Sequence, residues 1–184
     1  MRLSYPFIWF LTGLILISCK EEVLPKPKAA LRLEYDAGDE VKFKSENFEF
    51  QLNSLAQVEY GDDSSLTLNY PQMKGTIFIT YKRVSNNLER LLTDAQKLSY
   101  EHVVKADNIV EQPFVNEQDR AYGMYYEVMG NAASQAQFYV TDSIDHFVTG
   151  SLYFYAKPNY DSIYPAAVYL QKDMRDIMES LRWR

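Results

Sequence analysis

The sequence predicts an α+β domain, with a largely antiparallel sheet of about seven strands and two helices packed against it. Apolar and polar residues alternate over most of the chain after residue 46, which is the period of a strand with one buried face. That period changes to helical spacing only twice, once in the middle and once at the end. The 15 tyrosines and 10 phenylalanines also favour strands, because large rings pack well on a pleated, half-buried surface. Short links without βαβ alternation argue against a parallel sheet.

The first strands are expected between residues 48 and 82. Three short alternating runs predict three antiparallel strands, with a turn at 61–63 and a stop at Pro71. Their apolar faces are Phe48, Phe50 and Leu52, then Ala56, Val58 and Tyr60, then Leu66, Leu68 and Tyr70. The next run, 76–82, is apolar on both faces, so we expect it to be buried on both sides: Ile77, Ile79 and Tyr81 oppose Phe78. The charged segment 36–46 before these strands is expected to be a loop.

The first helix is expected after Ser85, with Ser85 or Asn86 as its cap. Its single apolar stripe follows helical spacing through Leu88, Leu91, Leu92, Ala95 and Leu98. A strand at 109–116 follows. Because Pro113 cannot donate a hydrogen bond to a neighbouring strand, this strand is expected at an edge of the sheet.

Three further strands and a helix complete the predicted domain. Short, turn-like links at 130–133 and 142–145 predict that these three strands form a meander. Their alternating residues are Tyr122, Met124, Tyr126 and Val128, then Ala136, Phe138 and Val140, then Gly150, Leu152 and Phe154. The final helix is entered through Asp161, Ser162 and Pro165. Its apolar stripe is Ala166, Tyr169, Leu170, Met174, Ile177, Met178 and Leu181.

The amino terminus carries the pattern of an export signal. Arg2 precedes an apolar segment at 7–17, which is shorter than the roughly 20 residues that a membrane-spanning helix needs. The run Leu16-Ile17-Ser18-Cys19 then resembles the bacterial lipobox, which predicts cleavage between Ser18 and Cys19. Residues 1–18 are therefore expected to be a lipoprotein signal peptide that is removed. The alternative is an uncleaved signal anchor or a buried, inert thiol.

Cys19 is the expected lipid attachment site, and it is the only cysteine in the chain. Diacylglycerol on its thiol and a further acyl chain on its amine, such as palmitate, would give the several hydrocarbon chains that stable anchoring requires. Residues 19–46 are expected to form an extended linker, because Pro25 and Pro27 favour a polyproline conformation. Within it, 31–35 alternates and could dock as a short strand. A single globular domain is expected at 47–184.

The charge balance limits the classes of partner. Without residues 1–18 the chain keeps 25 acidic residues and 18 of its 19 basic ones, so its formal charge is 18 − 25 = −7. Nucleic acids and anionic lipid surfaces attract a concentrated basic face, which an acidic chain does not offer. We therefore expect no nucleic-acid partner, and membrane attachment through the covalent lipid.

Several segments of the mature chain resemble a known family. The segments are Pro25-Lys26-Pro27-Lys28 with 31–35, Tyr70-Pro71-Gln72-Met73-Lys74-Gly75 with 80–82, Gly130-Asn131-Ala132-Ala133-Ser134 with 137–143, and a closing part at 146–147, 150–154 and 158–162. Together they are similar to the gliding-motility lipoprotein family GldD of Bacteroidota. The order of elements also resembles the Mog1/PsbP-like fold, a likeness that carries no function by itself.

The resemblance implies an outer-membrane lipoprotein of the cell envelope that gliding motility and type IX secretion require. It implies a machinery component that binds other envelope proteins, with no catalytic residues and no cofactor beyond the lipid on Cys19. The alternative, from another class, is a small-ligand-binding module with a pocket between sheet and helices. A deep apolar pocket would favour that alternative, and a filled core with a flat aromatic patch would favour assembly.

An enzymatic function has weak support in the sequence. A hydrolase needs a nucleophile within reach of a base, and Ser134, Asp142 and His146 are the one grouping to weigh. No Gly-x-Ser-x-Gly motif surrounds Ser134. Two separated histidines do not suggest a metal site, and the acidic pairs at 62–63 and 142–145 lack the further ligands of a calcium loop. We expect no enzyme, no metal and no phosphate-binding loop.

A partner interface is the favoured functional site. Tyrosine is enriched at protein interfaces, because it combines apolar area with one polar tip. Tyrosines gather near the last strand and the entry to the last helix, although many of these rings could instead pack the helix onto the sheet. The candidate interface comprises the hairpin between Asn131 and Asp142 and the Tyr-rich closing segment, with Asn131, Ser134, Tyr139, Asp142, Tyr153, Tyr155 and Tyr160 as its residues.

Overall fold

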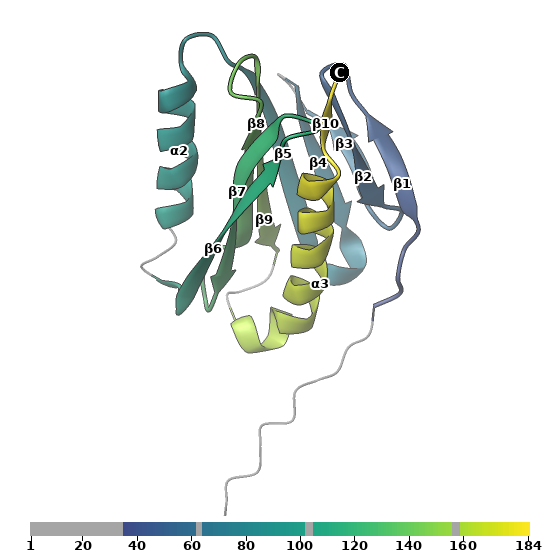
Figure 1. Cartoon of the computed structure of the whole chain (residues 1–184). Helices are drawn as coiled ribbons and strands as arrows, with labels where there is room; N and C mark the ends of the chain where they lie inside the picture. Colours follow the sequence, from purple (N-terminus) through teal and green to yellow (C-terminus); the bar gives the residue numbers. More distant parts are fainter. Residues whose placement is uncertain (1–34, 62–63, 102–104, 156–158) are drawn as a thin grey trace, which may run out of the picture. The chain divides into compact units, whose positions relative to one another are not determined.

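Ten strands in two antiparallel sheets and two α-helices make up the described part of the chain, which confirms the α+β class (Figure 1). The structure is a computed structural model, and it describes residues 35–61, 64–101, 105–155 and 159–184. The expected signal peptide, Cys19, Asp62 and Asp63 lie outside these residues, as does all but Tyr35 of the expected short strand at 31–35.

The larger sheet has seven strands, all antiparallel to their neighbours, in the order β3-β4-β5-β9-β8-β7-β6. The predicted meander is confirmed as β7-β8-β9, and the strand with Pro113 is confirmed as an edge. Pro71 ends β4 as expected and begins a short 3-10 turn. The strands are β3 (Gln57–Tyr60), β4 (Ser65–Tyr70), β5 (Gly75–Arg83), β6 (Asn108–Asn116), β7 (Ala121–Met129), β8 (Ser134–Thr141) and β9 (His146–Phe154).

The smaller sheet corrects two expectations. Its order is β1-β2-β10, formed by β1 (Glu40–Lys44), β2 (Phe48–Asn53) and β10 (Arg182–Trp183). β2 was expected to pair with the strands that follow it, but its two neighbours are β1 and the end of the chain. The loop expected at 36–46 is also wrong, because β1 lies within it. The charges of β1 conceal the strand, since Phe43 is its only buried residue.

The helix α3 (Tyr160–Glu179) lies against the inner face of the larger sheet and also contacts β2 of the smaller one (Figure 1). Its predicted apolar stripe is confirmed at the centre, where Leu170, Met174 and Ile177 are almost completely buried. They belong to one core cluster together with side chains of both sheets. Residues far apart in the sequence therefore share one core.

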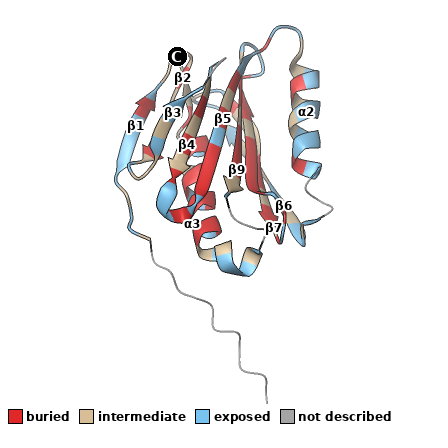
Figure 2. Cartoon of the chain, turned by 180° about the vertical axis from the view of Figure 1, so that it is seen from behind, coloured by how far each residue is buried: buried red, intermediate tan, exposed pale blue. Residues whose placement is uncertain are grey.

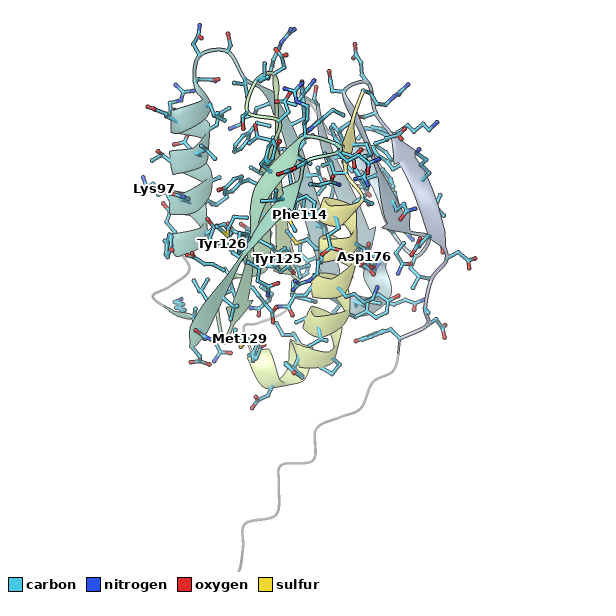
Figure 3. The ribbon with its side chains drawn as sticks, in the orientation of Figure 1. Lys97, Phe114, Tyr125, Tyr126, Met129 and Asp176 are labelled. Carbon is cyan, nitrogen blue, oxygen red and sulfur yellow. The ribbon has the colours of Figure 1, made fainter. Side chains whose placement is uncertain are left out.

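The helix α2 (Leu88–Tyr100) packs on the other face of the larger sheet, over β8. The side chains of Tyr125 and Tyr126, neighbours on β7, point to opposite faces (Figure 3). Tyr125 donates a hydrogen bond to the backbone oxygen of Gln171 on α3, whereas the ring of Tyr126 meets that of Tyr100 on α2 edge to face. A small second core cluster, Val84, Leu91 and Phe147, lies beneath α2.

The start of α2 and the burial of β5 differ from the expectations. Asn87 precedes the helix instead of Ser85 or Asn86, and its side chain accepts a hydrogen bond from the backbone N–H of Ser85. Asn86 takes a left-handed conformation with φ 55°. Phe78 on β5 is 39% exposed although Thr76 on the same side is completely buried, so this side of β5 is only partly buried. The reason is that α2 packs over β8 and leaves this part of the sheet uncovered (Figure 2).

Candidate functional site

The uncovered part of the larger sheet forms a surface that we call the outer sheet face. The strand register places Thr67 of β4, Phe78 and Thr80 of β5, and Tyr153 of β9 on this face. The rings of Phe78 and Tyr153 meet edge to face, with centroids 5.8 Å apart. Burial and the nearby carboxylate of Glu101 raise the pKa of Tyr153, so its hydroxyl is neutral at physiological pH. The face combines two aromatic rings with short polar side chains, a composition suited to protein contact.

The structure divides the residues of the predicted interface between opposite ends of the larger sheet. Ser134 begins β8 and pairs with Tyr153, which lies near the end of β9. Asp142 follows β8 at its other end, in the turn before β9. Asn131, Tyr155 and Tyr160 lie near the Ser134 end, because Asn131 and Tyr155 adjoin the strand ends and the side-chain oxygen of Asn131 accepts a hydrogen bond from the backbone N–H of Tyr160 at 2.9 Å. The predicted residues therefore do not form one continuous patch.

Two of the predicted interface residues are buried in their own turns. Ser134 is fully buried, and its hydroxyl donates to the backbone oxygen of Ala136. The neighbouring Gln135 donates from its amide to the backbone oxygens of Gly130 and Ala132, which closes the turn between β7 and β8. Ser134 is thus not available to a partner in this fold.

Asp142 is also buried, and it organises the turn between β8 and β9. Its Oδ1 accepts three hydrogen bonds of 2.9 Å, from the backbone N–H groups of Ile144, Asp145 and His146. Burial by itself would raise the pKa of Asp142, but the three donors outweigh that effect and lower its pKa below the ordinary value. Its carboxylate therefore stabilises a turn instead of contacting a partner.

The four tyrosines of the predicted set differ in exposure. Tyr139 is half-buried and stacks on Phe147 beneath α2, with ring centroids 5.8 Å apart. Tyr153 is half-buried on the outer sheet face, and Tyr160 is half-buried at the start of α3. Tyr155 follows β9 and is 68% exposed. Tyr153 and Tyr155 are the members of the set that the structure presents to solvent near the outer sheet face.

The hydrolase grouping is not assembled in this structure. Ser134 and His146 lie at opposite ends of the β8–β9 ladder, about 20 Å apart at roughly 3.3 Å per residue. Nδ1 of His146 lies 2.9 Å from the hydroxyl of Tyr81, and its ring stacks on Trp183. Since a nucleophile must reach its base directly, these residues cannot act as a catalytic triad.

A polar cluster that the sequence did not reveal holds the first described residues against α3. The hydroxyl of Tyr169 donates to the backbone oxygen of Asp36 at 2.8 Å and accepts from the side-chain amide of Asn53 at 2.8 Å. The Asn53 amide also reaches Oδ1 of Asp173 at 3.4 Å. We call Asn53, Tyr169 and Asp173 the tether-root cluster. Asn53 and Asp173 were missed because each looks like an ordinary surface residue, and their meeting depends on tertiary structure.

The clefts near this cluster are small. One of about 190 Å³ lies over the tether-root cluster and is lined by Glu40, Lys172 and Asp176 among others. Two more, of about 270 and 250 Å³, flank Pro71 and Tyr70. Small-molecule sites usually enclose about 300 to 1,000 Å³ and are mostly apolar. These clefts are smaller than that and open to solvent.

The described ranges contain no candidate metal centre and no candidate membrane-spanning helix. Within 35–61, 64–101, 105–155 and 159–184, no group of three or more His, Cys, Asp or Glu residues could hold a metal ion. In the same ranges, neither helix has the length and apolar character that crossing a bilayer demands.

Comparisons with known proteins add one positive finding. A family model described as gliding motility lipoprotein GldD matches residues 20–183, which is nearly all of the chain. Among curated proteins, none matches.

Proposed function

This chain belongs to the gliding motility lipoprotein family GldD, and we propose that it supports gliding and type IX protein secretion as a non-enzymatic component that binds other proteins of that machinery. Membership of the family makes it a lipoprotein with a membrane-anchored place in the envelope. The proposal adds the outer membrane as that membrane, Cys19 as the lipidated residue, and a contact surface as the working part of the domain.

The outer sheet face is the observation that carries the proposal. Exposed Phe78 lies beside Tyr153 on a surface that no other described element covers (Figure 2). An aromatic pair on a rigid sheet is a good anchor for a partner, because burial of large rings supplies much of the binding energy at interfaces. The Thr side chains around it provide a polar rim.

The process is tested by deleting the gene in its host and measuring gliding and the export of type IX cargo. We expect both to fail, and restoration by a plasmid-borne copy is the control. Unchanged export and motility after deletion would refute the proposed function. Density-gradient separation of inner and outer membranes tests the location, since the proposal requires the acylated protein in the outer-membrane fraction.

The surface is tested separately with Phe78→Lys, compared with Val115→Lys as a matched control. Val115 is a 64% exposed residue on the edge strand β6, on the same side of the larger sheet as Phe78 but four strands away from β5. We expect Phe78→Lys to reduce cargo export while the protein keeps its abundance and melting temperature, and Val115→Lys to have no effect. Equal export by the two variants would remove the outer sheet face from the proposal.

A further inference from the structure

An exposed apolar stripe runs along the first half of α3. Tyr160, Tyr164 and Val168 follow at intervals of four residues, so they lie above one another on one side of the helix. Tyr164 is 49% and Val168 46% exposed, and the rings of Tyr160 and Tyr164 meet edge to face at 5.5 Å. One further step along the helix, the same side becomes charged, where Lys172 pairs with Asp176 at 2.5 Å. We call Tyr160, Tyr164 and Val168 the α3 stripe.

The first described residues of the chain contact α3 at Tyr169, the residue that follows the last member of this stripe. The ring of Tyr35, the first described residue, packs edge to face against Tyr169, with centroids 5.7 Å apart. Tyr169 adjoins Val168 in the sequence and is fixed by its hydrogen bond to the backbone of Asp36. The point from which the amino-terminal segment departs is therefore held against α3.

The length of that segment limits how far α3 is from the membrane. Cys19 precedes Tyr35 by 16 residues, which span at most about 55 Å when fully extended. A surface tethered at this range meets the bilayer at an effective concentration on the order of millimolar. A weak affinity of the α3 stripe for lipid is then sufficient for contact.

The chemistry of the stripe fits the interfacial region of a bilayer. Tyrosine is enriched at the level of the lipid headgroups, because its ring is apolar and its hydroxyl is polar. The three members of the stripe carry no charge, so attraction to anionic lipid is not involved. A patch on another protein is the competing class of occupant. A protein partner is less favoured as the occupant because the lipid-anchored segment meets the domain at α3, which keeps this helix within reach of the membrane.

From these observations we propose that the α3 stripe rests on the bilayer that holds the lipid anchor, with Tyr164 and Val168 in the interfacial layer. The proposal relies on the membrane anchoring of the family and is independent of the partner surface. Contact along α3 fixes the side of the domain that meets the membrane. The outer sheet face is on the opposite side of the larger sheet from α3, so it points away from the lipid.

The test uses the acylated, full-length mature protein in phosphatidylcholine vesicles, with and without lipids brominated near the headgroup end of their acyl chains. Bromine quenches only nearby tryptophan, so Tyr164→Trp and Val168→Trp place reporters in the α3 stripe. Tyr60→Trp is the matched control, since Tyr60 is 78% exposed on the edge strand β3. Trp183 is the one native tryptophan after residue 18, and its fluorescence is present in every variant. The quenching of this native signal is measured with the unsubstituted protein and subtracted.

We expect brominated lipid to quench the added fluorescence of both stripe variants and to leave that of Tyr60→Trp unchanged. Quenching should persist at high salt, because contact between apolar groups is not screened. Equal quenching at all three positions, or none, would overturn the proposal. Absence of quenching together with lost secretion by a Tyr164→Ser, Val168→Ser double variant of normal melting temperature would assign the stripe to a protein partner instead. The quenching measurements themselves need no assay of the proposed function.

Discussion

Asp142 and Asp173 are both buried carboxylates, yet their surroundings shift their pKa values in opposite directions. Three backbone donors hold the pKa of Asp142 down despite its burial. For Asp173 burial is the larger effect and raises the pKa, while Asn53 and Tyr70 offset it only in part. The Tyr70 hydroxyl acts on this carboxyl group without reaching hydrogen-bond geometry with any described group. The two residues therefore respond to pH with opposite signs.

The first prediction concerns Asp142. Replacement by Ala leaves three backbone N–H groups without their acceptor, so we expect a loss of about 1–3 kcal/mol in the free energy of unfolding at pH 7. Because the pKa of Asp142 is lowered in the fold, its contribution is present above its unfolded pKa of about 4 and disappears as the pH falls through the folded value. Urea unfolding at pH 7 and pH 3 measures both effects.

Asp145→Ala is the matched control for this prediction. Asp145 is exposed in the same turn, and only its backbone takes part in the hydrogen bonds to Asp142. A loss of stability equal to that of Asp142→Ala would contradict the assignment of the turn's stability to the Asp142 carboxylate.

The second prediction concerns Asp173→Asn. Since burial raises the pKa of Asp173, the wild-type fold favours the protonated form, and its stability falls as the pH rises above the unfolded pKa. An amide at this position keeps an acceptor for Asn53 and carries no charge. We expect the variant to melt at a higher temperature than the wild type at pH 7, with a smaller difference at pH 4. Asp176→Asn, at a half-buried residue paired with Lys172, should lack this pattern.

At the scale of elements, the two helices differ in how they are held. α3 has eight buried residues, whereas α2 has only Leu91 and Ser99. Ser99 donates to the side-chain oxygen of Gln137, but the Gln137 amide nitrogen has no hydrogen-bond partner among the described groups. The second core cluster under α2 contains three buried residues. α2 is therefore attached to the sheet by few contacts, while α3 is part of the main core.

The third prediction follows from this difference. Native-state hydrogen exchange should show weaker protection for backbone amides of α2 than for those of α3, since elements with little buried surface open at lower free energy. The amides of β9, in the middle of the larger sheet, serve as the reference for global unfolding. Equal protection of the two helices would show that α2 opens only when the whole domain unfolds.

Periodicity predicted most elements, because one buried face leaves a regular pattern in the sequence. It identified α3 through Leu170, Met174 and Ile177, and it identified the meander. Periodicity missed β10, because a strand of two residues is too short to show an alternating pattern. It also missed the pairing of β2 with β10, because these strands lie far apart in the sequence. The interface prediction failed at Ser134 and Asp142 for a different reason. Polar residues near turns are usually exposed, so we expected both to be accessible. Here both are buried, because Ser134 donates a hydrogen bond to a backbone oxygen and Asp142 accepts hydrogen bonds from backbone N–H groups.

At the scale of the whole molecule, three surfaces have separate assignments. The amino-terminal segment leaves beside Tyr169, the α3 stripe flanks that point, and the outer sheet face lies on the other side of the larger sheet. The lipid anchor was predicted from the sequence, and the family supports a lipoprotein. The surfaces could not be predicted, because exposure depends on which strands the helices cover.

The fourth prediction tests the anchor at this scale. Cys19→Ala removes the thiol that receives the diacylglycerol group, so we expect no labelling by radioactive palmitate and loss of the protein from the membrane fraction. Cys19→Ser, which keeps the size of the side chain but lacks the thiol, should behave in the same way. Continued labelling of either variant would show that the lipid is attached elsewhere.

The position of α3 and β10 late in the sequence has a consequence for folding. The helix that fills the larger sheet and the strand that completes the smaller one are made last, from residues 160–183. Until these residues have emerged, the earlier strands have no partner to cover their apolar faces, and long-range pairing of this kind is slow. We therefore expect the core of the domain to close only after residues 160–183 have been synthesised.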